Sequence, residues 1–137
     1  MSESEPVYAQ SAVVPFRRVE GALEVLLITS RSRKRWLVPK GLLEPDMTPA
    51  ESAAKEALEE AGVRGRTNEA SIGEFSYKKW GGRCVVEVFP MEVTEELDDW
   101  DEKDERERRW VTLDEAVELV DRKGLRRILR GLRGQLR

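Results

Sequence analysis

Three glutamates stand close together in the segment KEALEEAGV, residues 55–63, at a spacing that can support chemistry. If this segment is helical, Glu56, Glu59 and Glu60 occupy positions i, i+3 and i+4 on one face, where like charges repel each other. Carboxylate oxygens are the ligands that Mg²⁺ prefers, and a divalent cation would offset the repulsion. The spacing alone is more often typical of a solvated helix face, so a second observation has to favour the metal site.

The segment before these glutamates supplies that observation. Lys40 and Gly41 follow a short apolar run, and six residues, 42–47, then lead directly into a helix cap. This order places the backbone carbonyls of a glycine turn beside the glutamate face, so that hard oxygen ligands come from both sides. The residues therefore favour a site for a divalent cation, at which substrate phosphate oxygens would complete the coordination.

The helix that carries the glutamates has clear boundary signals. Thr48 is a typical N-cap, Pro49 suits the first helical position, Glu51 completes a capping box, and Gly62 suits a left-handed terminator. We therefore predict a helix over 49–61. Its small apolar residues form one stripe that would pack closely on a sheet, leaving the glutamates on the solvent side. The stripe comprises Ala50, Ala53, Ala54, Ala57, Leu58 and Ala61.

Strand and helix patterns extend along the whole chain. Apolar, β-branched runs predict strands at 11–19, 22–30, 35–39, 71–80 and 83–93, the last two joined by a hairpin turn at Gly81 and Gly82. Two further helices are predicted, one over 112–120 with a capping box and a basic C-terminal helix at about 124–136. At 137 residues, we expect a single domain covering 1–137.

Composition excludes several classes of chemistry. The chain has one cysteine, Cys84, and no histidine, which excludes an internal disulfide, a Cys/His zinc site and catalysis by imidazole. No apolar run approaches membrane length, and the first ten residues lack a basic region followed by an apolar core. We therefore expect a cytoplasmic protein without a membrane partner.

Charge is segregated along the sequence. Residues 16–40 contain seven basic and two acidic side chains, residues 92–107 are strongly acidic, and every charged residue after Asp121 is basic. The first basic group adjoins the glutamate helix and could gather anions. A net charge of −3 gives no overall attraction to a polyanion, so a nucleic-acid partner is not expected.

The segment 41–63 resembles a known motif, the Nudix box, written G-x5-E-x7-R-E-U-x-E-E-x-G-U with U an aliphatic residue. The matching residues are Gly41, Glu56, Ala57, Glu59, Glu60, Gly62 and Val63, whereas Met47 replaces the first glutamate and Lys55 the arginine. The flanking segments resemble the branch of the Nudix hydrolase family that contains diphosphoinositol polyphosphate phosphohydrolases and diadenosine polyphosphate hydrolases. The resemblance covers roughly residues 11–120.

This resemblance implies an α/β/α sandwich, with a curved mixed β-sheet between helices, and the hydrolysis of a phosphoanhydride bond with Mg²⁺ or Mn²⁺. Glu56, Glu60 and the Gly41 carbonyl would be metal ligands, and Glu59 the proton acceptor or a further ligand. Lys40 would lie near the substrate phosphates. Lys55 keeps the charge of the motif arginine but loses its bidentate fork.

The expected substrate is a small polyphosphorylated molecule, either a dinucleoside polyphosphate or a diphosphoinositol polyphosphate. By position, Arg31, Lys79 and Arg106 are the residues most similar to phosphate-binding residues of this branch, in addition to Lys40. Four tryptophans are candidates either for stacking on a base or for packing. A module that binds nucleotides or polyphosphates without cleaving them is the alternative, and both a monomer and a homodimer remain open.

Overall fold

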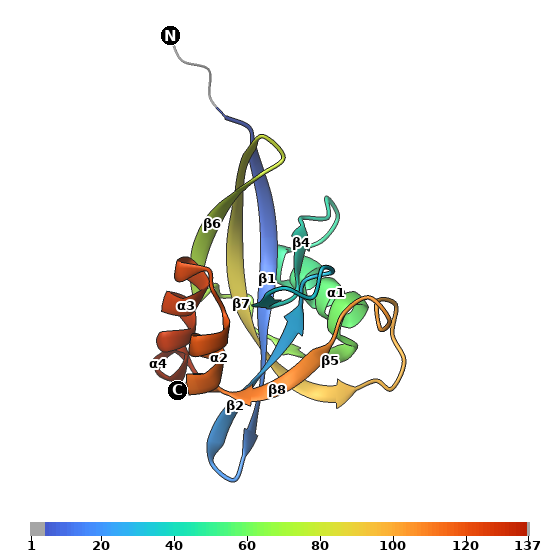
Figure 1. The fold of residues 1–137 in the computed structure, drawn as a ribbon, viewed down its shortest axis with the longest axis vertical. Coiled ribbons are helices and arrows are strands. Elements are labelled where there is room, and N and C mark those ends of the chain that lie inside the picture. Colours follow the sequence, from blue (N-terminus) through green and yellow to red (C-terminus); the bar gives the residue numbers. More distant parts are fainter. Residues whose placement is uncertain (1–4, 137) are drawn as a thin grey trace.

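A mixed sheet of eight strands forms the centre of the protein in the computed structural model, which describes residues 5–136 (Figure 1). The strands are β1 (Val7–Val19), β2 (Ala22–Thr29), β3 (Trp36–Leu37), β4 (Lys40–Leu42), β5 (Val63–Thr67), β6 (Gly73–Lys79), β7 (Gly82–Glu96) and β8 (Arg108–Thr112). The helices are α1 (Pro49–Ala61), α2 (Leu113–Leu119), α3 (Lys123–Arg130) and α4 (Leu132–Gln135).

The long strands β1 and β7 pair in parallel at the centre of the sheet, and all other strand pairs are antiparallel. The main path runs β3-β2-β1-β7-β5, with β4 paired to β1, β6 to β7 and β8 to β2. Because β1 pairs with β2, β4 and β7 along its length, it connects the two halves of the sheet. Strand β4, which contains Lys40 and Gly41, is thereby fixed against Ala12 and Ser11.

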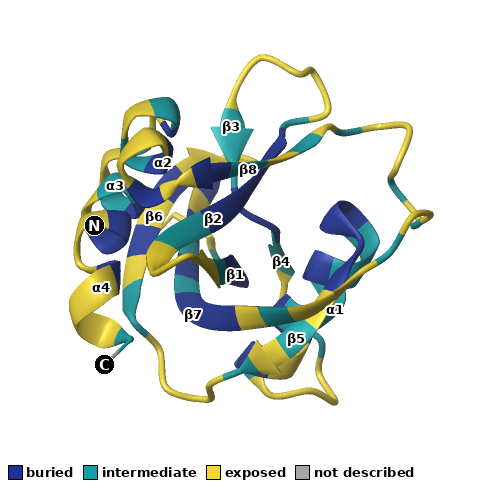
Figure 2. Ribbon diagram, turned by 90° about the horizontal axis from the view of Figure 1, so that it is seen from below, coloured by how far each residue is buried: buried dark blue, intermediate teal, exposed yellow. Residues whose placement is uncertain are grey.

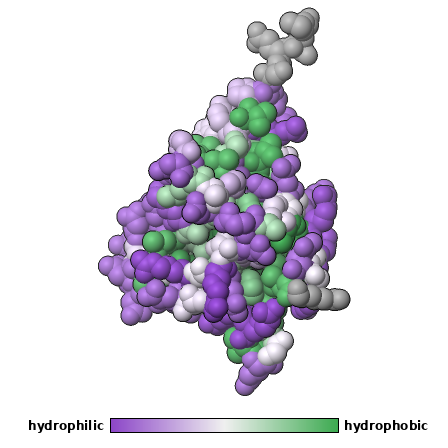
Figure 3. Space-filling view, turned by 180° about the vertical axis from the view of Figure 1, so that it is seen from behind, coloured by the Kyte–Doolittle hydropathy of each residue, from purple (hydrophilic) through white to green (hydrophobic). Residues whose placement is uncertain are grey.

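Helices cover both faces of the sheet, which confirms the predicted α/β/α sandwich (Figures 1 and 2). Helix α1 packs on one face over a core that includes Val13, Leu26 and Phe89. Helices α2, α3 and α4 pack on the other face over a separate core that includes Leu125 and Leu129. From behind, hydrophilic side chains cover most of the surface, and apolar side chains occur only in small groups (Figure 3).

Helix α1 confirms the predicted boundaries. The Thr48 hydroxyl accepts a hydrogen bond from the Glu51 backbone N–H at 3.1 Å, and the Glu51 carboxylate accepts one from the Thr48 N–H at 2.9 Å. Gly62 ends the helix with φ of 66°, in the left-handed region. The alanine stripe lies against the sheet: Ala50, Ala53, Ala57 and Ala61 are fully buried.

Three details of the sequence prediction were wrong. The C-terminal helix predicted at about 124–136 is divided at Gly131 into α3 and α4, because glycine is a poor helix former. The tight turn between β6 and β7 consists of Trp80 and Gly81 rather than Gly81 and Gly82. The short strands β4, β5 and β8 were not predicted, since their sequences lack a long apolar alternation.

Candidate active site

Gly41 and Glu56 make the closest approach at the candidate metal site. A Cβ atom added to Gly41 would lie 2.4 Å from Glu56 Cδ and 2.6 Å from its Oε1, well inside van der Waals contact. The backbone of Gly41 is not in the left-handed region, so glycine is required here for space and not for conformation. The absence of a side chain lets the Glu56 carboxylate lie directly against the backbone of β4.

Glu60 is buried beneath the same strand, although the sequence predicted it on the solvent side. Its side chain accepts a hydrogen bond from the Lys40 backbone N–H at 3.2 Å and lies 3.8 Å from Arg106 Nη2. Only 6% of the residue is exposed. The helix face remains open at Glu59, but β4 and the segment before β8 close over Glu60.

Burial raises the pKa of both carboxyl groups at this point. Burial raises the pKa of Glu60 to about 8, aided by the neighbouring Glu56 and opposed by Arg106. Burial also raises the pKa of Glu56, whose carboxyl group lies close enough to that of Glu60 to interact with it. Two carboxylates in such contact need either a proton or a cation between them to be stable at neutral pH.

The donor set fits a hard divalent cation. Glu56 and Glu60 are in contact, the Gly41 backbone lies against Glu56, and oxygen ligands of this kind suit Mg²⁺ or Mn²⁺. Within residues 5–136, no three Cys, His, Asp or Glu side chains are arranged as a complete metal cage. The structure thus brings two of the three predicted glutamates together, and a substrate or water would have to supply further ligands.

Glu59 turns instead toward Lys55, at the position where the motif has arginine. The Lys55 ammonium lies 2.7 Å from Glu44 Oε1 and 3.7 Å from Glu59 Oε2, and its pKa is raised by the hydrogen bond to Glu44. Lys55 therefore links the loop before α1 to the helix. Met47, which replaces the first glutamate of the motif, is 37% exposed and offers no carboxylate.

A basic cleft with a volume of about 400 Å³ opens beside Glu60. All four residues predicted to bind phosphate line it: Arg31, Lys40, Lys79 and Arg106. Burial, together with repulsion from the neighbouring cations, lowers the pKa of Lys40 to about 8 despite the opposing effect of Glu60. The cleft therefore has an excess of positive charge and suits a polyanionic ligand.

The sequence analysis missed Arg35, Tyr77 and Arg122 among the residues that line this cleft. The Arg122 guanidinium lies 3.9 Å from the centroid of the Tyr77 ring, and Lys40 Nζ lies 4.9 Å from it. Arg122 Nε is buried without a hydrogen-bond partner among residues 5–136. The only signal in the sequence was the basic character of the chain after Asp121, which did not distinguish Arg122 from its neighbours.

Acidic residues pair with three of the arginines that line the cleft, Arg31, Arg106 and Arg35, the last of which lies 3.8 Å from Asp121. Arg106 Nε bonds Glu102 at 2.8 Å, and its Nη1 donates to the Thr29 carbonyl at 3.1 Å. Arg31 lies 3.4 Å from the same Glu102 and 3.3 Å from Glu105. These contacts connect the segment before β8 to the β2–β3 loop and orient both guanidinium groups at the cleft.

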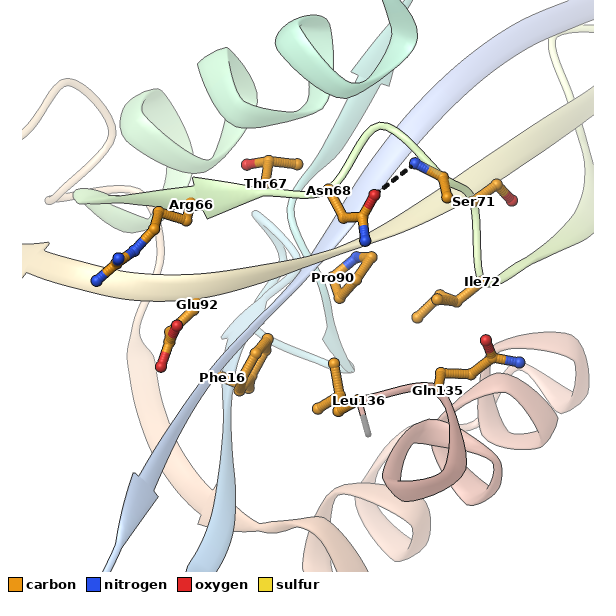
Figure 4. A pocket seen from close by; sticks show the side chains of 11 residues that line it. Phe16, Arg66, Thr67, Asn68, Ser71, Ile72, Pro90, Glu92, Gln135 and Leu136 are labelled. Carbon is orange, nitrogen blue, oxygen red and sulfur yellow. Dashed lines mark hydrogen bonds between the residues drawn. The ribbon is translucent and has the colours of Figure 1, made fainter.

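A second cavity, of about 540 Å³, lies apart from the glutamates (Figure 4). Phe16, Pro90 and Ile72 form an apolar floor between the β5–β6 loop and α4, and Arg66 and Glu92 lie at one side. None of the predicted catalytic, metal-binding or phosphate-binding residues lines this cavity. Glu60 and the four predicted phosphate-binding residues line the basic cleft instead.

Comparison with known proteins shows which family has this fold. Residues 7–132 match the family model described as NUDIX domain. The chain is 41% identical over 115 residues to Nudix hydrolase 12, mitochondrial, from Arabidopsis thaliana, covering 78% of this chain and 57% of that protein. It is 35% identical over 106 residues to diphosphoinositol polyphosphate phosphohydrolase 3-beta from Bos taurus, covering 75% and 63%, respectively. The chain thus spans less than two thirds of the length of either relative.

A solved structure gives the same fold at lower sequence identity. The crystal structure of the C. elegans Ap4A hydrolase superposes with a TM-score of 0.78 at 22% identity, covering 96% of this chain and 100% of that one. Fold and site together define a Nudix domain. The chain belongs to the Nudix hydrolase family, as the motif at 41–63 predicted. No helix among residues 5–136 has the length and apolar character needed to cross a membrane.

Proposed function

We propose that this chain is a metal-dependent pyrophosphohydrolase that cleaves a phosphoanhydride bond in a polyphosphorylated small molecule. The observation that carries the proposal is the contact of Glu56 with Glu60 at the edge of a cleft lined by cationic side chains. A cation site next to a polyanion site is what phosphoanhydride hydrolysis requires, because negative charge must be neutralised at the reacting phosphorus.

Each residue of the site has a proposed role. Glu56, Glu60 and the Gly41 carbonyl would hold Mg²⁺ or Mn²⁺, which when bound activates water and neutralises phosphate charge. Glu59, whose side chain is 34% exposed beside them, would accept the proton from the attacking water. Lys40, with its lowered pKa, would place a short-range positive charge against a phosphate oxygen.

The remaining cations support a substrate with several phosphates. Arg31, Arg35, Lys79, Arg106 and Arg122 come from four separate segments of the chain and all line the cleft. A single phosphate cannot contact all of them, whereas an extended polyphosphate can. The two substrate classes that this supports are dinucleoside polyphosphates and diphosphoinositol polyphosphates.

One observation favours the alternative, a module that binds polyphosphates without cleaving them. Met47 supplies no carboxylate, and Glu44, an acidic residue of the same loop, is paired with Lys55 at 2.7 Å. The metal would then have fewer protein ligands than the motif provides, which would weaken its binding.

The test is phosphate release from a panel of dinucleoside polyphosphates, diphosphoinositol polyphosphates, nucleoside triphosphates and ADP-ribose, with Mg²⁺ and with excess chelator. Glu59→Gln is the control for contaminating hydrolases. We expect metal-dependent release that the variant loses. Binding of these ligands without turnover of any of them would favour the alternative.

A further inference from the structure

Trp80 differs from the other tryptophans because the fold leaves about half of it exposed to solvent. Trp36 and Trp110 are half-buried against the two cores, and Trp100 lies beneath the guanidinium of Arg108, 3.9 Å from the ring centroid. Trp80 is 51% exposed. Packing therefore explains three of the four tryptophans, but it does not explain Trp80.

The turn that contains Trp80 does not need a tryptophan. Trp80 and Gly81 form the two-residue loop between β6 and β7, with φ of 55° and 69°, as a type I′ turn requires. Asn, Asp or Gly usually fills the first position, and a bulky residue with positive φ is uncommon. The equivalent turn between β1 and β2 has Glu20 and Gly21, with φ of 50° and 82°. Turn geometry therefore does not explain the indole.

Neighbouring residues hold the Trp80 ring in place. The Tyr8 ring meets it edge-on, with centroids 5.3 Å apart and an interplanar angle of 82°. The Tyr8 hydroxyl donates to the Trp80 carbonyl at 3.4 Å, and the Arg83 N–H donates to the Pro6 carbonyl at 2.8 Å. The start of β1 thus holds the tip of the hairpin in place. A ligand that stacks on the Trp80 ring would therefore cause a smaller loss of side-chain entropy.

The Trp80 ring contacts a residue that lines the basic cleft. Lys79 Nζ is 4.7 Å from the centroid of the Trp80 ring, and Lys79 lines the cleft together with Lys40 and Tyr77. A phosphate bound by Lys79 would therefore lie next to the Trp80 ring. A nucleotide has this combination of groups, since its charged phosphates are joined through a ribose to a flat base.

We propose that Trp80, braced by Tyr8, is a stacking platform for a nucleobase whose attached polyphosphate lies in the basic cleft. The proposal rests on the proposed function and narrows its substrate to dinucleoside polyphosphates in preference to diphosphoinositol polyphosphates. Every nucleobase has a π face that can stack on an indole, and stacking of this kind tolerates different bases. An inositol ring has no such face.

Steady-state kinetics of wild type, Trp80→Ala and Trp80→Phe test the platform, with diadenosine tetraphosphate and a diphosphoinositol polyphosphate as substrates. Glu20→Ala, which changes the first residue of the equivalent turn far from the cleft, is the matched control. We expect Trp80→Ala to lower kcat/KM for diadenosine tetraphosphate by about tenfold to a hundredfold, mainly through KM. Trp80→Phe should retain most of the wild-type value, and Glu20→Ala should match wild type.

Binding measurements separate this proposal from the proposed function. Calorimetric titration in excess chelator, with diadenosine tetraphosphate and with inorganic tripolyphosphate, requires no turnover. We expect Trp80→Ala to weaken binding of the first ligand and to leave tripolyphosphate unchanged. Equal weakening of both ligands, or of neither, would overturn the platform even if the enzyme is active. An inactive wild type with the expected binding pattern would overturn only the hydrolase assignment.

Discussion

Substitution of Gly41 by alanine tests whether the contact between Gly41 and Glu56 controls the reaction. A Cβ atom at position 41 would lie 2.4 Å from Glu56 Cδ, and ordinary contact begins at 3.4 Å, so the carboxyl group must move by at least 1.0 Å. A displacement of about 1 Å in a catalytic constellation can cost about a hundredfold in rate. This corresponds to about 2.7 kcal/mol of transition-state stabilisation.

The same substitution should barely change stability. The backbone of Gly41 is in a region that alanine also adopts, and the obstructing atoms belong to the flexible end of a half-buried side chain. We therefore expect the melting temperature of Gly41→Ala to stay within about 3 °C of wild type. The matched control is Gly134→Ala in α4, where an added Cβ meets no atom within 4 Å.

Two assays measure the effect. Steady-state hydrolysis with Mg²⁺ gives kcat/KM, and electron paramagnetic resonance of Mn²⁺ gives metal affinity without turnover. We expect Gly41→Ala to lower kcat/KM about a hundredfold and to weaken Mn²⁺ binding, while Gly134→Ala changes neither. If Gly41→Ala keeps both quantities within twofold of wild type, Glu56 does not need its observed position and the reasoning fails.

Three further predictions concern the carboxylates, the loop and the cleft. Glu60→Gln should lower turnover by orders of magnitude. In excess chelator, wild type should lose stability as pH rises, and Glu60→Gln should not show this loss. Folding raises the pKa of Glu60 to about 8, so the contribution of Glu60 to the free energy of unfolding is present below pH 4.5 and is lost as pH rises to about 8. Thermal unfolding at pH 5 and pH 8.5 would disprove this if wild type and variant respond alike. Lys55→Arg should keep or raise turnover, because the fork can bond both acidic neighbours, and Met47→Glu should tighten Mn²⁺ binding by adding an oxygen ligand; loss of activity in both folded variants would contradict the assigned roles. Arg122→Gln should lower kcat/KM for polyphosphates about tenfold, whereas Arg130→Gln, on an exposed part of α3, should not; equal effects would remove Arg122 from the binding site.

The sequence predicted those features of the site that local signals determine. Helix α1 was predicted to the residue because Thr48, Pro49 and Gly62 specify its ends, and the positions of Gly41 and Glu56 follow from a motif of fixed spacing. The burial of Glu60 was not predictable in the same way. It depends on β4 and on Arg106, a residue 46 positions later whose approach is set by the pairing of β8 with β2.

Long-range packing also explains the missed cleft residues. Arg122 approaches Tyr77 across 45 positions of sequence, and its place follows from the packing of α2 and α3 on the sheet. Nothing local separates it from the other arginines of the basic tail. The aromatic candidates show the same limit: only the three-dimensional structure distinguishes the exposed Trp80 from the three tryptophans used in packing.

The distribution of the site along the chain has a consequence for synthesis. The proposed metal ligands lie within residues 41–60, whereas Arg106 and Arg122, which complete the cleft, lie in the last third. Chains emerge from the ribosome N-terminus first, so the carboxylate pair would leave it before the wall that binds the polyphosphate. A chain truncated after Val120 would keep every proposed metal ligand but lose Arg122 and the core residues Leu125, Leu129 and Leu132. The site is therefore complete only after the last third of the chain has folded onto the sheet.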